Sequence, residues 1–204
     1  ALETAGWLYI DTGDYDKGKT YVSEALALYQ ELGDEIGTAW ALALLGGYAL
    51  SFPDEVKEGI TLCEEGLALF RKAGHKPGIM QALTILGELR RLEGTYDLAQ
   101  KAYTECLALS RKTGYKLREA ITLANLASVA QHEDYPEQAV AYYSECLTKL
   151  RELGDNKYSA MNLARMAGPV TAVGDPQAAA RLLGHQKLFW RCLVLPSMPA
   201  IGRI

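Results

Sequence analysis

The 204-residue sequence has little that would support a metal site, a disulfide framework or a membrane anchor. Its four cysteines include no Cys-x-x-Cys pair, and its three histidines include no His-x-x-x-His pair. The ligand spacing that a metal site needs is therefore missing. No stretch approaches the roughly 18 apolar residues of a membrane span, and Glu3 interrupts a signal-peptide pattern at the N-terminus. We expect no metal, no cofactor and no membrane association.

The charge pattern of a nucleic-acid-binding protein is also lacking. The formal net charge is −4, and no run of lysine or arginine is longer than two, so there is no basic footprint for a phosphate backbone. Cys63, Cys106 and Cys146 fall in equivalent stretches of successive repeats, which favours burial over disulfide formation. We therefore expect a reducing, cytoplasmic compartment and no direct nucleic-acid partner. The missing initial methionine indicates a piece of a longer chain.

What the sequence does contain is an internal repeat. Four related phrases of the type Glu-Ala-Leu-Ala-Leu-Tyr are each followed, a few residues later, by a glycine. They begin at Glu24, Glu65, Glu105 and Glu145. Successive phrases are 41, 40 and 40 residues apart. This regular period, with apolar residues at helical spacing inside it, predicts a helical repeat array.

Turn and capping signals divide each period into two helices. A turn is predicted at Glu93-Gly94-Thr95, and Arg71-Lys72 before Gly74 is typical of a helix C-terminus. The sequence thus predicts an all-α fold of about five antiparallel helix hairpins that bury their core between neighbours. The expected helix pairs lie near 2–31, 36–72, 77–112, 117–152 and 157–192. We assign repeats near 1–34, 35–74, 75–114, 115–154 and 155–192 to a single array, 1–192, followed by a non-helical tail, 193–204, that caps the array or marks a truncated next repeat.

The hairpins resemble the tetratricopeptide repeat (TPR). In the third unit Leu86-Gly87, Gly94-Thr95-Tyr96, Ala99 and Tyr103 stand where that family has its Leu-Gly, Gly-Asp-Tyr, alanine and aromatic residues. The resemblance covers nearly the whole chain and implies a right-handed superhelical solenoid. The unit is about six residues longer than the usual TPR. In this it resembles the C-terminal helical region of large bacterial ATP-dependent signalling regulators of the LuxR or predicted-ATPase type, where such repeats sense a ligand or partner.

One motif points to a different chemistry. Residues 13–20 read Gly-Asp-Tyr-Asp-Lys-Gly-Lys-Thr and satisfy the G-x-x-x-x-G-K-T pattern of a phosphate-binding loop. That loop needs a buried strand before it, whereas this segment falls on a turn between helices. Asp14 and Asp16 would also place negative charge against a phosphate. We therefore interpret the match as coincidence and expect no enzyme activity.

The resemblance implies that the first helix of each hairpin lines a concave, partner-binding face. Counting from the family positions, this face carries Trp7, Asp11, Trp40, Gly47, Gln81, Thr84, Glu88, Arg91, Asn125, Ser128, Gln131 and Arg165. Trp7 beside Gly46-Gly47 can leave a slot for an aromatic or sugar-like group. Alternatively, a preceding repeat covers Trp7 and the two glycines serve only close helix packing.

Asn125 stands where some family members help to clamp a peptide carboxylate, but the cationic partners are replaced by Thr84, Glu88, Ala164 and Gly168. Binding of an extended peptide backbone and participation in a solvent network remain two alternatives for Asn125. Glu88 and Arg91 are interpreted as a solvated ion pair. We expect a non-catalytic module that binds a protein or peptide within a larger bacterial signalling or transcription regulator. The alternative is a sensor for a small metabolite, and the terminal repeats can self-associate where polar caps are lacking.

Overall fold

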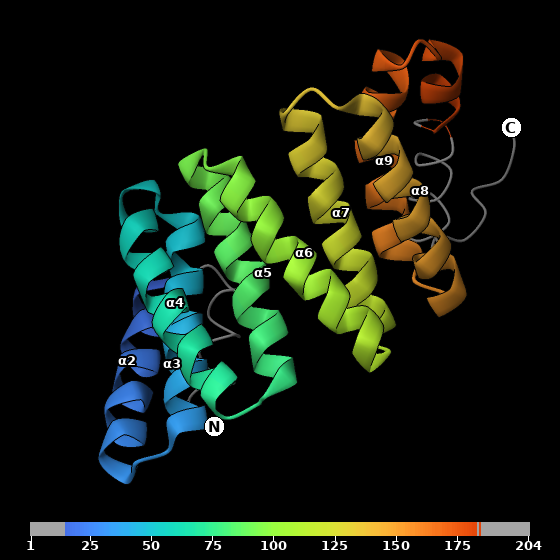
Figure 1. Ribbon diagram of the computed structural model, residues 1–204. Helices are drawn as coiled ribbons and strands as arrows, with labels where there is room; N and C mark the ends of the chain where they lie inside the picture. Colours follow the sequence, from blue (N-terminus) through green and yellow to red (C-terminus); the bar gives the residue numbers. More distant parts are fainter. Residues whose placement is uncertain (1–14, 183, 185–204) are drawn as a thin grey trace, which may run out of the picture. The chain divides into compact units, whose positions relative to one another are not determined.

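The computed structural model describes residues 15–182 and 184, and all regular structure in this part of the chain is helical (Figure 1). The helices are α2 (Tyr15–Leu32), α3 (Glu35–Tyr48), α4 (Val56–Lys72), α5 (Lys76–Glu93), α6 (Tyr96–Thr113), α7 (Lys116–His132), α8 (Pro136–Leu153) and α9 (Asn156–Ala172). Two short 3₁₀ turns, Ala49–Ser51 and Pro53–Glu55, connect α3 to α4. A further helical stretch at 176–182 follows α9.

The predicted all-α fold of antiparallel hairpins is confirmed. The pairs α3/α4, α5/α6 and α7/α8 lie where the repeat period places them, and successive helices pack against each other within each pair. The chain divides into two compact units, 1–113 and 114–204. Below, the first unit means the part that holds α2 to α6, and the second unit means the part that holds α7 to α9. The assignment of all repeats to a single array with a tail from 193 stays a prediction.

Glycines at the predicted helix ends adopt the left-handed conformation. Gly74, Gly94 and Gly154 have φ values of 65°, 85° and 68°, a region that residues with a Cβ avoid. At the end of α7 the equivalent place is taken by Asp134, with φ of 62°. An aspartate tolerates this conformation better than most residues do, because its short side chain can hydrogen-bond locally. The glycines that the sequence places at the ends of helices therefore lie where the chain reverses direction.

The core of the first unit is built from apolar side chains of α3 to α6, with Phe70, Leu83 and Leu89 fully or almost fully buried. Close helix approach depends on glycine. A Cβ added to Gly46 would lie 2.5 Å from the Cys63 sulfur and 2.7 Å from the carbonyl oxygen of Gly59. This geometry supports the packing interpretation of Gly46.

The second unit buries Leu123, Leu126 and Leu150 between its helices. Pro169 lies inside α9 and is itself buried, so one hydrogen bond of the helix ladder is missing there. None of the described helices combines the length and the apolar character that crossing a bilayer requires.

Candidate interaction site

The structure places the predicted face residues on the first helices of the hairpins. Trp40 and Gly47 lie on α3, Asn125, Ser128 and Gln131 on α7, and Arg165 on α9; four more lie on α5. Trp7 and Asp11 fall outside the described residues. Because the two units are separate bodies, the face is described for each unit by itself.

In the first unit the face is a polar stripe along α5 made of Gln81, Thr84, Glu88 and Arg91, all half-buried. Residues at this spacing lie one above the other on a helix. The Thr84 hydroxyl donates to the backbone carbonyl of Met80 at 2.7 Å. The Arg91 guanidinium donates to Glu88 Oε2 at 2.8 Å and 3.2 Å. The stripe therefore presents fixed polar groups, and its two charges are neutralised as the predicted ion pair.

Beneath this ion pair lies Tyr103 of α6, whose side chain is completely buried. Its hydroxyl is without a well-formed hydrogen bond to any residue that the structure describes. Burial, and then the nearby Glu88 carboxylate, raise the pKa of Tyr103 far above its usual range, although Arg91 acts in the opposite direction. Burial alone would lower the pKa of Arg91, but the hydrogen bond and charge of Glu88 hold it above its ordinary value. Glu88, Arg91 and Tyr103 thus form one electrostatically coupled group.

Trp40 lies against aromatic side chains of its own unit. Its ring centroid is 5.0 Å from that of Phe70 and 5.9 Å from that of His75, both in edge-to-face geometry. These contacts give the half-buried indole a packing role, and a ligand role for it stays a prediction. A Cβ on Gly47 would meet Ile85 at an ordinary 3.6 Å, so space exists beside Gly47 on this face.

In the second unit the face carries neutral groups and one cation. The hydroxyls of Ser128 and the buried Tyr143 lie 3.2 Å apart. A Cβ on Gly168 would be 3.2 Å from Gln131 Nε2, which places α7 and α9 side by side at this level. Arg165 is exposed. Burial raises the pKa of Tyr143, and both the Ser128 hydrogen bond and the charge of Arg165 work against this rise.

Asn125 is half-buried, and its side-chain amide has no hydrogen bond to another residue in the described part of the chain. An amide offers two donors and an acceptor. It is therefore able to bind an extended backbone or ordered water, which were the two alternatives from the sequence.

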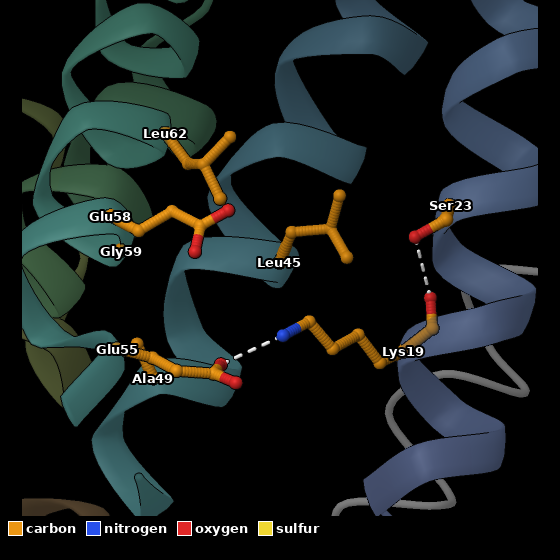
Figure 2. Close-up of a pocket in the computed structure, with 8 residues that line it drawn as sticks. All are labelled: Lys19, Ser23, Leu45, Ala49, Glu55, Glu58, Gly59 and Leu62. Atoms are coloured by element: carbon orange, nitrogen blue, oxygen red, sulfur yellow. Dashed lines mark hydrogen bonds and ion pairs between the residues drawn. The ribbon is translucent and has the colours of Figure 1, made fainter. Parts of the chain in front are cut away.

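The pockets formed by described residues that we find lie instead on the second-helix side, which sequence reasoning did not identify as hollowed. Figure 2 shows the one between α2, α3 and α4, where Lys19 Nζ reaches Glu55 at 2.8 Å beside the apolar side chains of Leu45 and Leu62. A related pocket lies between α4, α5 and α6, and the ion pairs Arg71–Glu105 and Arg90–Glu64 line it. The residues that line the second pocket lie about one repeat after those that line the first, for example Leu86 after Leu45. The repeat period could therefore have predicted one pocket from the other.

The segment that matches the phosphate-binding-loop pattern does not form such a loop. Residues 15–17, between the two glycines of the pattern, already belong to α2, so they form no loop around a phosphate. Lys19 is held by Glu55 at 2.8 Å, and the Thr20 hydroxyl donates to the carbonyl of Asp16 at 2.9 Å. Gly13 and Asp14 fall outside the described residues. Within those residues, no group of three or more His, Cys, Asp or Glu side chains is arranged to hold a metal ion.

Comparison with known proteins bears on the fold. A family model described as "Tetratricopeptide repeat" matches residues 1–32. No curated protein matches the sequence. Among solved structures, BtubC (BKLC) from P. vanneervenii is similar with 18% sequence identity and a TM-score of 0.85, over 100% of this chain and 83% of that one.

Two further similar structures are a signal transduction ATPase and a gene regulator. A Signal Transduction ATPase with Numerous Domains (STAND) protein with a tetratricopeptide repeat sensor, from Pyrococcus horikoshii, is 15% identical with a TM-score of 0.75, over 96% of this chain and 30% of that one. The Rap conjugation gene regulator of plasmid pLS20, in complex with the Phr* peptide, is 16% identical with a TM-score of 0.74, over 95% of this chain and 53% of that one. The chain therefore has the fold of TPR-like helical repeats.

Proposed function

We propose that this chain is a non-catalytic interaction module whose first-helix faces bind a peptide or an extended segment of a partner protein. The observation that carries the proposal is the polar stripe on α5, where Gln81, Thr84, Glu88 and Arg91 are half-buried. A ligand can reach such groups, and they hold a defined geometry before it arrives. Amide, hydroxyl and paired charged groups at one-turn intervals suit the alternating donors and acceptors of an extended backbone.

The second unit supports the same mode of binding with different chemistry. Asn125 offers amide groups that no described residue occupies, and Arg165 adds an exposed positive charge. One of the similar structures is a Rap regulator in complex with a peptide, and another carries a TPR sensor within a STAND ATPase. We infer from these likenesses that the module acts within a larger regulator and that its partner is a peptide or protein segment.

The test is affinity capture from a lysate of the source organism with three versions of the chain. The first is the native chain. In the second, Glu88→Arg with Arg91→Glu keeps an ion pair on α5 but reverses the charges that a ligand meets. The matched control is Arg71→Glu with Glu105→Arg, which reverses an exposed ion pair of 2.7 Å on the second-helix side.

We expect a protein that the native chain and the Arg71/Glu105 control retain and that the Glu88/Arg91 variant loses by at least about tenfold, which corresponds to about 1.4 kcal/mol of binding free energy. The eluates are read for small molecules as well. A metabolite with the same pattern would contradict the peptide proposal and support a sensor. A partner lost equally by both variants, or by neither, would contradict binding through the α5 stripe.

A further inference from the structure

The N-cap residues just before the first helices of the hairpins lie at equivalent positions of successive repeats but have different side chains. They are Asp34, His75, Tyr115 and Asp155. Asp34 and Asp155 each accept a hydrogen bond through Oδ1 from the backbone N–H three residues later, at 2.9 Å. His75 makes the equivalent cap with its imidazole, because Nδ1 accepts from Gly78 N at 3.1 Å. Tyr115 has no side-chain cap.

The His75 ring is fixed in this orientation by its aromatic neighbours. It stacks on Phe70 with centroids 5.5 Å apart and an interplanar angle of 26°, and the edge of Trp40 approaches it at 5.9 Å. Gly78 lies directly against Phe70, so close that a Cβ there would overlap the ring. The donor, the acceptor and the ring between them therefore belong to one packed junction of α3, α4 and α5.

The charged groups on the elements around this junction are mostly cations. They are Asp34 and Glu35 at the start of α3, Arg71 and Lys72 at the end of α4, Lys76 at the start of α5, and Arg111 and Lys112 at the end of α6. Glu35 is already paired with Lys72, at 2.5 Å, and Arg71 with Glu105, at 2.7 Å. No carboxylate is bonded to the His75 ring among the described residues. A proton on the imidazole would therefore have no hydrogen-bonded carboxylate to compensate its charge.

We propose that His75 makes the start of α5 a pH-sensitive joint, capped when the imidazole is neutral and released when it is protonated. An imidazolium carries N–H on both nitrogens and has no acceptor, so Nδ1 would then face the Gly78 N–H donor to donor. The added charge would also sit at the positive end of the α5 dipole.

The direction of the pH dependence follows. Because only the neutral imidazole can accept from Gly78 N, we expect the cap to be present at neutral pH and to be lost when acid protonates the ring. The carboxyl groups of Asp34 and Asp155 keep an acceptor oxygen in either protonation state, so their caps do not depend on this switch. This device goes beyond the proposed peptide binding, although α5 also carries the stripe that the proposal uses.

The experiment measures hydrogen exchange of backbone amides by NMR on the full chain, at pH 7.5 and pH 5.5, corrected for intrinsic exchange. Gly78 reports the His75 cap, and Gly37 is the internal control, because Asp34 caps it at the same repeat position. His75→Asn is the matched variant, since its side-chain oxygen can cap but does not titrate. Unchanged protection of Gly37 shows that the variant is folded.

We expect the protection of Gly78 in the native chain to fall about fivefold on acidification, the factor that corresponds to a cap of about 1 kcal/mol. Gly37 should change by less than about twofold, and Gly78 in His75→Asn should be equally insensitive. The proposal is overturned if Gly78 keeps its protection at pH 5.5 in the native chain. It is also overturned if the loss is the same in His75→Asn, because the titrating group would then lie elsewhere.

Discussion

Tyr103 and Tyr143 occupy the same repeat position in the first and second units, and their surroundings show how one scaffold carries two surface chemistries. Both rings are buried beneath a first helix. Above Tyr103 the helix has Gly87 and Glu88, and the ring touches Gly87 so closely that no Cβ would fit. The equivalent residues forty positions later are Ala127 and Ser128.

The difference is largest at the hydroxyl groups. The hydroxyl of Tyr143 is hydrogen-bonded to that of Ser128 at 3.2 Å, so a neutral neighbour gives it a partner. Tyr103 lies below the Glu88–Arg91 ion pair without a well-formed bond to a described residue. The same repeat position on the face therefore holds the charged Glu88 in one unit and the neutral Ser128 in the other. In both units a small residue, Gly87 or Ala127, precedes it above the tyrosine ring.

The strongest way to break this comparison is Gly87→Ala. The added methyl group would overlap the ring of the buried Tyr103, so we expect a loss of about 2 kcal/mol in the free energy of unfolding, even after the gain in helix propensity. Urea unfolding followed by circular dichroism measures it.

The matched control is Gly47→Ala on α3, where the new Cβ would lie 3.6 Å from Ile85. This variant should be neutral or up to about 1 kcal/mol more stable, because alanine favours a helix. Equal losses in both variants would show that backbone freedom, and not the ring contact, makes glycine necessary at Gly87.

Cys63 holds the same repeat position one unit earlier and allows a test in alkali. Burial first, and then the charge of Glu64, raise the pKa of this thiol from about 9 to about 12. A raised folded-state pKa contributes stability that is complete below pH 9 and is lost as the pH rises toward 12. Cys63→Ala should therefore flatten the decline of unfolding free energy between pH 9 and pH 11, by up to about 1.4 kcal/mol per pH unit.

The readout is the difference in slope between the native chain and Cys63→Ala, because the small cavity left by the thiol lowers the baseline at every pH. Parallel curves from pH 7 to pH 11 would mean that the Cys63 thiolate is reached by water in the folded state. Cys146, whose pKa burial also raises to about 12 against the opposing charge of Arg165, should give a similar change in the second unit.

The helices themselves were predictable because they depend on local signals. Apolar spacing, the repeat period and the glycines at helix ends placed α5, α6 and the turn at Gly94 correctly. The same period located the stripe on α5, since residues one turn apart share a helix face. Such features require only the sequence within one hairpin.

The partners of the face residues could not be predicted in the same way. The coupling of Tyr103 to Glu88 and Arg91 depends on the tilt of α6 against α5, which no periodicity encodes. Arg90 is bonded to Glu64 at 2.6 Å across a separation of 26 residues, and many other carboxylates were equally available in the sequence. The two 3₁₀ turns before α4, Ala49–Ser51 and Pro53–Glu55, were not predicted either.

The most delicate comparison removes only the two hydroxyl groups. Tyr143→Phe should cost about 1 kcal/mol of unfolding free energy, because the hydrogen bond between the Tyr143 and Ser128 hydroxyls is lost. Tyr103→Phe should cost nothing or stabilise the fold by up to about 1 kcal/mol, because the buried hydroxyl that it removes pays for desolvation without a well-formed bond. Urea unfolding of both variants, side by side at pH 7, compares the signs directly. If Tyr103→Phe lost as much as Tyr143→Phe, the Tyr103 hydroxyl would be bonded to Glu88 or Arg91 in solution, and the two units would differ in the charge of the partner but not in its presence.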